Sequence, residues 1–384
     1  MDAATGAVVP SASALHWMRG MSTLCRCVFA TALVAAVAGC HREPTAAELA
    51  EERRCSVTDF KTDGSIGGRW NAATQTLAYS RPDADGYYQA YVADADGNHE
   101  RLVTNPAWPA HRHQFVVDWH PSGKYLFVEV EKADHPGSSD DAIPGYGAYT
   151  DLWLVTPDGA KAWLLFELPN DYDHAITHGI ATPDGTRFTF TERVKAPNFL
   201  DVNLAAGSYV FNVADFVDDG ATPHLENIRP YQPGGVDQGG EVDGFAEDDA
   251  TIAFYSTYVT KNLFASRIYT WNTNTGNIVE LSHDSFAQAP KYTPSGGRIV
   301  YMTGSGADIF PGEIQGADWW SVGVDGSAPR RLTFMNQWDG AHSVNHYRLA
   351  GVLSFDSDTS FYGDVMTQPL GLVGKIVKVS CDSL

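Results

Sequence analysis

The stretch His120-Pro121-Ser122-Gly123-Lys124-Tyr125-Leu126-Phe127-Val128 joins a tight turn to an alternating apolar strand, and its recurrence decides the fold. Clear copies are Thr182-Pro183-Asp184-Gly185-Thr186-Arg187-Phe188-Thr189-Phe190 and Thr293-Pro294-Ser295-Gly296-Gly297-Arg298-Ile299-Val300-Tyr301, and weaker copies cover 71–79 and 246–254. Proline presets φ at the turn, glycine accepts the position with positive φ, and period-2 alternation is typical of a half-buried strand. The phrase therefore predicts a repeated turn-and-strand unit.

A hairpin pattern follows each copy of this unit. Such patterns cover residues 88–103, 151–165, 268–281 and 318–333, with looser versions at 209–228 and 364–379. Four-stranded sheets of this kind cannot bury both faces alone, and radial stacking of the sheets is the β-propeller solution. We expect an all-β, six-bladed β-propeller with four-stranded antiparallel blades, in which 55–60 adds a strand to the last blade. The weak sixth repeat, 347–379, leaves seven blades open.

These repeats resemble the TolB-like family of WD-like propellers. The resemblance is carried by the turn-and-strand phrase and by the hairpin starts DLWLVTPDG (151–159) and DWWSVGVDG (318–326), and it covers roughly residues 60–380. It implies the propeller fold, but no single activity, because the family includes scaffolds, receptors and enzymes. The chain holds no Gly-x-Ser-x-Gly motif, which excludes the propeller-bearing serine hydrolases.

The composition fits this fold and excludes one class of partner. Aromatic residues make up 12% of the chain, and 36 glycines and 20 prolines suit many short strands and tight turns. The 384 residues carry 26 Lys+Arg against 47 Asp+Glu, a formal net charge of −21. Nucleic-acid binding needs a basic face to neutralise phosphates, so no nucleic-acid partner is expected.

The N-terminal region carries an export signal. Arg26 precedes an apolar run at 27–38, which is too short to span a bilayer but has the length of a signal-peptide core. The run ends in Val37-Ala38-Gly39-Cys40, which resembles the lipobox of bacterial lipoproteins, with Cys40 as the lipidated first mature residue. An ordinary signal peptide that happens to precede a cysteine is the alternative.

These features predict three parts: the signal region 1–39, a tether at 40–54 and the propeller at 55–384. A lipid on Cys40 would place the protein on the periplasmic side of the outer membrane or on the cell surface. His41 is not the aspartate that usually keeps lipoproteins at the inner membrane.

The cysteine count predicts a disulfide. Of the five cysteines, Cys25 and Cys27 leave with the signal peptide and Cys40 takes the lipid. Cys55 and Cys381 remain as an even pair in an oxidising compartment, so we expect them to join the two ends of the domain. Two free thiols are the alternative.

Histidines are the candidate ligands. Several precede the repeat turns, where propeller chains enter near the central channel, and neutral imidazoles converging from different blades could bind a transition metal. The candidates are His113, His174, His178, His342 and His346. The TolB-like resemblance adds that channel histidines hold a divalent metal in an oligogalacturonate lyase, although only some positions match. The alternative is that these histidines bond to backbone in loops.

Other polar and aromatic residues point to structure. The stretches 83–86 and 94–97 begin like calcium loops but lack the glycine and glutamate that an EF-hand needs, so they predict hairpin turns. Trp70 and Trp119 share one repeat position, which favours packing between blades. Trp163, Trp271, Trp320 and Trp338 are less regular and could line a binding surface. Asp118, Asp171 and Asp173 lie near candidate histidines and could orient them.

The sequence predicts a non-catalytic scaffold. We expect a monomeric, lipid-anchored propeller that binds an envelope protein, peptide or polysaccharide through loops at the channel mouth, with no cofactor. Insertions at 133–149 and 198–207 are candidates for shaping that face. A metal-dependent polysaccharide lyase or hydrolase, with a divalent metal in a His-lined channel, is the alternative function. A structural subunit of an envelope complex is a third.

Overall fold

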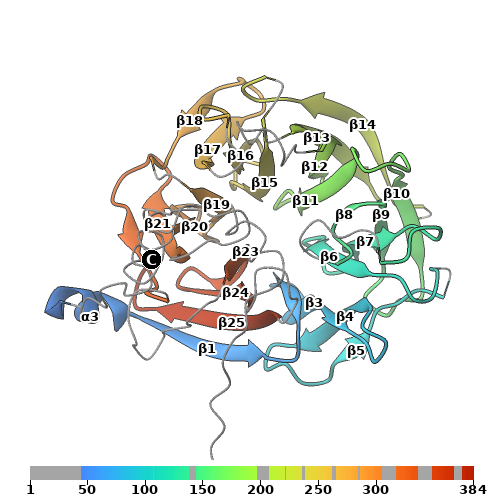
Figure 1. Cartoon of the computed structure of the whole chain (residues 1–384), viewed down its shortest axis with the longest axis horizontal. Helices are drawn as coiled ribbons and strands as arrows, with labels where there is room; N and C mark the ends of the chain where they lie inside the picture. The colour runs from blue at the N-terminus through green and yellow to red at the C-terminus, as the bar shows by residue number, and fades with distance from the viewer. Residues whose placement is uncertain are drawn as a thin grey trace, which may run out of the picture. The chain divides into compact units, whose positions relative to one another are not determined.

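The computed structural model describes residues 45–106, 108–137, 144–196, 207–220, 222–235, 238–261, 265–283, 286–304, 317–335, 348–366 and 374–384. Six antiparallel sheets form within these ranges. Figure 1 shows them set around one central axis, which confirms the predicted six-bladed propeller. Within the same ranges, no helix has the length and apolar character needed to cross a membrane. The predicted signal region and Cys40 lie outside the described residues.

Each sheet is one blade, and its main strands run from the central axis outward. Blade 1 contains β2 (Ile66–Asn71), β3 (Thr76–Pro82), β4 (Tyr88–Asp94) and β5 (Arg101–Leu102). Blade 2 contains β6 (Gln114–Trp119), β7 (Leu126–Glu131), β9 (Thr150–Val155) and β10 (Ala162–Phe166). Blade 3 contains β11 (Ala175–Ala181), β12 (Arg187–Lys195), β13 (Ser208–Val217) and β14 (His224–Tyr231).

The remaining blades follow the same plan. Blade 4 contains β15 (Gly240–Phe245), β16 (Thr251–Ser256), β17 (Arg267–Asn272) and β18 (Ile278–Glu280). Blade 5 contains β19 (Ala287–Tyr292), β20 (Arg298–Gly304), β21 (Ala317–Gly323) and β22 (Arg330–Arg331). Blade 6 contains β23 (Arg348–Ser357), β24 (Ser360–Met366), β25 (Gly374–Cys381) and, outermost, β1 (Cys55–Lys61).

The repeated turns have the predicted backbone. Gly123, Gly185 and Gly296 have φ of 71°, 73° and 70°, the left-handed region in which glycine carries no Cβ penalty. In each case the glycine N–H donates to the carbonyl three residues earlier, on His120, Thr182 or Thr293. The turn therefore joins the first and second strands of blades 2, 3 and 5.

A β-bulge interrupts the inner strand of every blade. The register shifts fall between Ile66 and Arg69, Val116 and Asp118, Ile176 and His178, Val242 and Gly244, Gln288 and Lys291, and Ala350 and Ser354. A bulge leaves backbone groups without a ladder partner. In three blades a side chain of the preceding blade accepts a hydrogen bond from a backbone N–H near the bulge. Ser80 accepts from Val116 N–H at 2.9 Å, and Thr191 accepts from Val242 N–H at 3.0 Å. Asp364 likewise accepts from Gly67 N–H at 2.7 Å.

Aromatic pairs pack across the seams between blades. The rings of Phe127 and Phe188 stack 3.9 Å apart between blades 2 and 3, and Trp319 meets Phe361 edge-on at 5.5 Å between blades 5 and 6. A Cβ at Gly363 would lie 2.4 Å from the Trp319 ring, so only glycine fits there. This packing buries apolar side chains at the seams between neighbouring blades.

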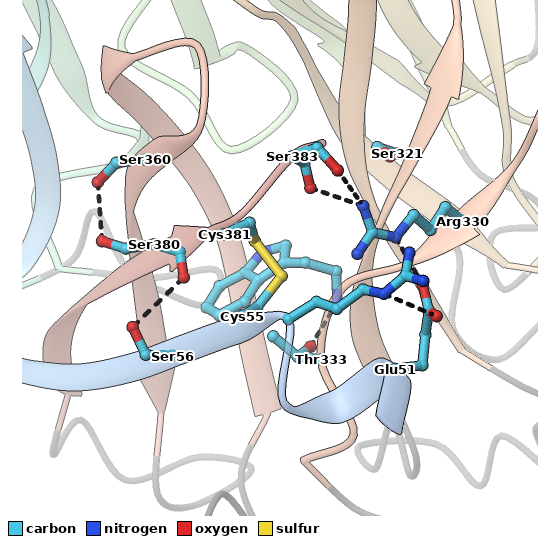
Figure 2. Close-up of a disulfide and its surroundings, with 12 residues drawn as sticks. Glu51, Cys55, Ser56, Ser321, Arg330, Thr333, Ser360, Ser380, Cys381 and Ser383 are labelled. Atoms are coloured by element: carbon cyan, nitrogen blue, oxygen red, sulfur yellow. Dashed lines mark hydrogen bonds and ion pairs between the residues drawn. A yellow bond between two sulfur atoms is a disulfide. The ribbon is translucent and has the colours of Figure 1, made fainter. Parts of the chain in front are cut away.

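The ring closes by pairing the two ends of the domain. Strand β1 (blue in Figure 1) pairs antiparallel with β25 (red), and Cys55 lies opposite Cys381. A disulfide joins these two cysteines, as the cysteine count predicted (Figure 2).

A short helix continues this seam. Helix α3 (Ala46–Glu52) lies within the predicted tether and begins with a capping box of Thr45 and Glu48. Arg330 of β22 donates to Glu51 at 2.7 Å and to the Ser383 carbonyl at 2.7 Å (Figure 2). The helix and the C-terminus are therefore both held by blade 5.

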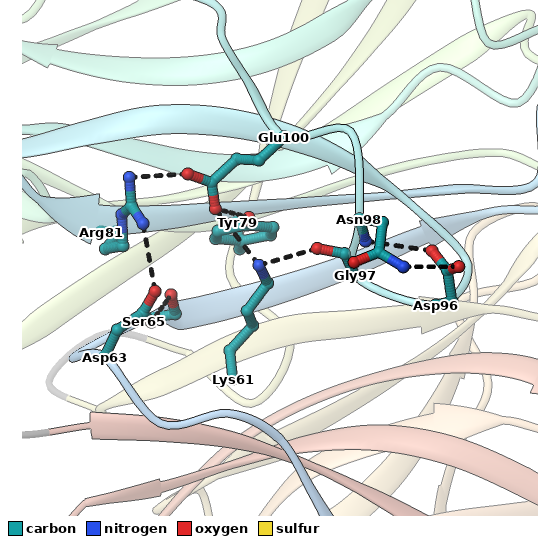
Figure 3. A network of polar contacts seen from close by, with 9 residues as sticks. All are labelled: Lys61, Asp63, Ser65, Tyr79, Arg81, Asp96, Gly97, Asn98 and Glu100. Carbon is teal, nitrogen blue, oxygen red and sulfur yellow. Dashed lines mark hydrogen bonds and ion pairs between the residues drawn. The ribbon is translucent and has the colours of Figure 1, made fainter.

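A polar network links the end of β1 to blade 1 (Figure 3). Lys61 donates to the Gly97 carbonyl at 3.0 Å and to Glu100 at 3.2 Å. Arg81 pairs with Glu100 at 2.6 Å and with Asp63 at 3.1 Å. The closing strand is thus bonded to the first blade as well as to the last.

The third sheet departs from the expected four strands. A fifth strand, β8 (Gly147–Ala148), pairs with Ala175 and Ile176 on the channel side of β11. It comes from the 133–149 insertion, which was expected to shape a face of the ring. One end of this insertion instead lies along the innermost strand of blade 3, because that strand still has free ladder positions on its inner edge.

Candidate functional site

The candidate site is built from one repeated position on the inner strands. Two residues before the first residue of each repeat turn, the chain has Arg69, Asp118, Ile180, Gly244 and Lys291. These residues lie on β2, β6, β11, β15 and β19, at or after the bulge. Three of the five carry a charge, on inner strands that are mostly buried and that also hold the polar residues His178, Glu241 and Asp243.

A cavity of about 260 Å³ opens beside this position and takes residues from five blades. Its apolar walls include Trp70, Trp119, Pro183 and Tyr292. At roughly 30 Å³ per water molecule, it holds about nine waters or one ring-sized group. Asp118 and Lys291 are the two charged side chains among its lining residues.

Lys291 is the cation of the cavity. Burial lowers the pKa of Lys291 to about 8; the carboxylates of Asp118 and Asp243 oppose this shift, and the charge of Arg69 adds to it. No hydrogen bond or direct ion pair to Lys291 forms within the described part of the chain. The amine is therefore desolvated and unpaired.

Asp118 is the carboxylate of the cavity. One of its oxygens accepts from Ala181 N–H at 3.0 Å, a bond that links blade 2 to blade 3. Asp118 was expected to orient a histidine, but within the described chain its carboxylate accepts from this backbone amide. It places a carboxyl group at the wall of the cavity.

Arg69 lies deeper and is fully buried, with 1% of its surface exposed. Its Nε donates to the Val117 carbonyl at 2.5 Å, while Nη1 and Nη2 have no hydrogen-bond partner among the described residues. Burial lowers the pKa of Arg69, and the carboxyl groups of Asp118, Asp364 and Asp243 oppose that shift. Two guanidinium nitrogens are thus removed from water without a hydrogen-bond acceptor among the described residues to replace it.

A histidine and two acids lie buried in the same ring. His178 Nε2 is 3.4 Å from Asp243 Oδ1, and its Nδ1 is 3.0 Å from the Thr177 carbonyl. That carbonyl can only accept, so the ring proton is on Nδ1. Burial lowers the pKa of His178 and raises that of Asp243, so it favours the neutral form of each group, while the charges of Lys291 and Arg69 oppose the shift of Asp243.

Glu241 extends this cluster toward the 133–149 insertion. It accepts from Tyr146 O–H at 2.9 Å, and burial raises the pKa of Glu241 to about 7. The middle of the ring therefore holds acids whose burial favours their neutral forms, beside an arginine with two unpaired nitrogens.

The structure separates the predicted histidines. His113 is half-buried at the start of β6 and accepts from Tyr88 N–H at 3.0 Å. His174 lies before β11, bonded to Asp171 at 2.8 Å, and Asp173 accepts from Ala196 N–H at 3.0 Å. His178 alone of these three is buried among the central charges.

The metal site stays a prediction. His342 and His346 lie outside the described residues. Among the residues that are described, no three His, Cys, Asp or Glu side chains form a group that could hold a metal ion. The Asp-rich stretches form turns as expected: Asp83 accepts from Tyr87 N–H at 2.9 Å, and Gly97 N–H donates to the Asp94 carbonyl.

The tryptophans of the repeat have two roles. Trp119 Nε1 donates to the Arg69 carbonyl at 3.0 Å, and Trp70 stacks on Tyr362 at 6.0 Å, so both pack between blades. Both also line the cavity. Trp271 is buried in the core beside Tyr231, and Trp338 lies outside the described residues.

Arg69 and Lys291 were not among the residues predicted from the sequence. A signal was present, because aligning the repeats on the turn puts these two cations and Asp118 at one position. A bulge precedes that position, so simple alternation does not show that it faces the channel.

Comparisons with known proteins agree on fold. No protein-family model and no curated protein matches the sequence. Similar solved structures include TolB from Acinetobacter baumannii, which is 13% identical with a TM-score of 0.47; the match covers 82% of this chain and 65% of that TolB. The likeness is one of fold.

Two further structures show the same kind of likeness. A putative TolB from Agrobacterium tumefaciens is 17% identical with a TM-score of 0.42, covering 69% of this chain and 73% of that one. A luciferin-regenerating enzyme is 10% identical with a TM-score of 0.50, covering 85% and 95%. At these identities no activity carries over from these proteins to this chain.

Proposed function

We propose that this protein is a lipid-anchored, non-catalytic binding propeller of a bacterial cell envelope, whose channel-mouth cavity holds a small ligand or one protruding group of an envelope partner. The cavity of about 260 Å³ carries this proposal, because five blades contribute apolar walls and two charges to one concave space. Such a mostly apolar pocket with a few placed polar groups is the usual form of a ligand site.

The buried centre of the ring supports binding at the mouth. Arg69, His178 and Asp243 have 1%, 4% and 1% of their surface exposed, so the middle of the ring is packed. A ligand that enters from the cavity would meet this packed floor. The rigid inner strands then present the walls in one fixed arrangement.

A chosen substitution tests the cavity. Ala72 lies on its rim and is exposed, so Ala72→Trp should fill the opening and leave the blade intact. In ligand-detected NMR with a diverse fragment set, we expect fragments to bind the unmodified chain and to bind this variant at least about tenfold more weakly, a loss of ~1.4 kcal/mol.

Ala73→Trp is the matched control, because Ala73 is the next residue, is also exposed and does not line the cavity. It should bind fragments as the unmodified chain does. Absence of binding by fragments of any charge, or equal binding by both variants, would overturn the proposal.

The anchor is the second part of the proposal. Cys40 lies five residues before Thr45, where helix α3 begins, and that helix is held at the outside of the ring by Arg330 (Figure 2). A lipid at Cys40 would therefore lie a short stretch of chain before a helix that the ring holds in place. Stable membrane attachment by a lipid needs no basic surface, in accord with the net charge of −21.

Substitution of Cys40 tests the anchor. We expect the unmodified chain to fractionate with membranes, and Cys40→Ser to appear chiefly in the soluble fraction, because the serine cannot take the thioether-linked lipid. Quantitative immunoblotting of both fractions measures this. Cys27→Ser, a similar change inside the signal region, serves as control. Unchanged membrane association of Cys40→Ser would contradict the lipid anchor.

A further inference from the structure

We propose that the cavity is selective for organic monocarboxylates, with the carboxylate bound at Lys291 and an apolar, ring-sized body bound between the aromatic walls. The inference rests on the proposed binding function and names the chemical class of its ligand. Two cations at the centre of the ring, Lys291 and Arg69, support it.

Lys291 differs from the lysines around the ring. Lys132 pairs with Asp151 at 2.5 Å, Lys375 with Asp59 at 2.6 Å and Lys61 with Glu100 at 3.2 Å. Lys291 lines the cavity and has no such partner within the described residues. A desolvated cation without a partner is costly, and an anionic ligand would offset that cost.

Arg69 adds a second unpaired cation. Its Nη1 and Nη2 have no partner among the described residues although the side chain is 1% exposed. The positive charge of Arg69 contributes to lowering the pKa of Lys291, so the two cations lie near enough to repel each other. One anion near both cations would relieve this repulsion, whereas a cationic ligand would increase it.

The neighbouring acids do not supply the negative charge that Lys291 and Arg69 lack. Asp118 Oδ2 is bonded to Ala181 N–H at 3.0 Å, and Asp118 makes no direct ion pair with Lys291 in the described chain. Asp243 and Asp364 are 1% and 2% exposed, and burial favours their neutral forms. Because the carboxylate of Asp118 already acts on Lys291, a singly charged carboxylate suits these cations better than a dianionic phosphate.

The walls define the rest of the ligand. Trp70, Trp119, Phe245 and Tyr292 present aromatic surfaces to the cavity, and Ile180 and Pro183 add aliphatic surface. A bare inorganic anion would leave these apolar walls exposed to water. A carboxylate carried on an aromatic or alicyclic ring would fill a space of about 260 Å³ and bury its apolar surface there.

Three probes of equal shape and different charge test the inference. Isothermal titration calorimetry of the purified full chain at pH 7 would compare 3-phenylpropionate, neutral 3-phenylpropanamide and cationic 3-phenylpropylamine. We expect the acid to bind at least about tenfold more tightly than the amide, a difference of ~1.4 kcal/mol, and the amine to bind most weakly.

Variants of the lysine complete the test. Lys291→Met should weaken binding of the acid about tenfold or more and make acid and amide nearly equal, while Lys291→Arg should keep the preference for the acid. Lys161→Met is the matched control, because Lys161 is exposed in the turn between β9 and β10, far along the chain from the cavity residues. It should leave all three affinities unchanged. Thermal melts would verify that each variant is folded.

The outcomes separate the two proposals. If the amide or the amine binds as tightly as the acid, and Ala72→Trp still blocks binding, the cavity is a site but its carboxylate selectivity is wrong. Tighter binding of the corresponding phosphonate, or no effect of Lys291→Met, would also overturn the carboxylate inference. If no probe or fragment of any charge binds, the proposed function fails together with it.

Discussion

Replacing both Cys55 and Cys381 by alanine is expected to lower the free energy of unfolding by about 2–5 kcal/mol. The two cysteines are 326 residues apart, so the bond constrains nearly the whole unfolded propeller. The chain-entropy model gives a ceiling of about 6 kcal/mol for such a loop. The folded ring should survive, because β1 remains paired with β25 and Lys375 still bonds Asp59 at 2.6 Å. Guanidinium unfolding under oxidising conditions measures the difference.

The single variants are the controls for this result. Cys55→Ala and Cys381→Ala should each lose about as much stability as the double variant, since one substitution already prevents the bond. A reducing agent should destabilise the unmodified chain and leave the double variant unchanged. A double variant as stable as the oxidised parent would contradict a stabilising bond.

Replacing Asp364 by asparagine is expected to stabilise the protein at pH 8 by a few kcal/mol, on the order of 3. The carboxyl is 2% exposed; burial raises the pKa of Asp364 from 3.8 to about 7, although a hydrogen bond from Gly67 N–H and the charge of Arg69 oppose that shift. Asparagine retains an oxygen to accept from Gly67 N–H and removes the cost of a buried negative charge.

The sign of the pH dependence follows from that raised pKa. Between about pH 4 and 7 the folded protein holds a proton that the unfolded chain has released, so this group makes the folded state less stable as the pH rises. Above pH 7 its contribution is constant. The advantage of Asp364→Asn over the unmodified chain should therefore vanish near pH 4 and reach its full size near pH 7–8. Glu241→Gln should behave in the same direction, because burial raises the pKa of Glu241 to about 7.

Urea unfolding from pH 4 to 8 measures the difference in the free energy of unfolding between Asp364→Asn and the unmodified chain. His178 acts in the opposite direction, since burial lowers its pKa and acid would force a charge on it. Asp85→Asn, at a side chain 65% exposed, is the control and should show little pH-dependent difference. If Asp364→Asn is no more stable than the parent at pH 8, the buried carboxyl is not a source of strain.

Local patterns were enough to predict the fold. The turn needs a glycine with positive φ, and Gly123, Gly185 and Gly296 have it. Alternation along each strand follows from the two-residue period of a β-strand. The disulfide could be predicted because the expected export leaves two cysteines, at the two ends of a fold that closes on itself.

The candidate site could not be predicted in the same way. His178 is close in sequence to His174, yet one is buried in β11 and the other is bonded to Asp171 on a loop. Their four-residue separation does not predict which face of the strand His178 occupies, because a bulge lies between Ile176 and His178. A bulge adds one residue to one strand, so every later side chain exchanges faces.

The sequence by itself predicted the repeated turn, the strand alternation and the closing cysteine pair, because each depends on residues that are neighbours in the chain or on an even number of remaining cysteines. It favoured six blades and left seven open, and the structure has six. Only the tertiary structure decided that Arg69, Asp118 and Lys291 share one centre, since they come from three blades and their strands meet only when the ring closes. Burial then changes their chemistry: it leaves Lys291 and Arg69 as desolvated, unpaired cations, a property that belongs to the ring and not to any segment of its sequence.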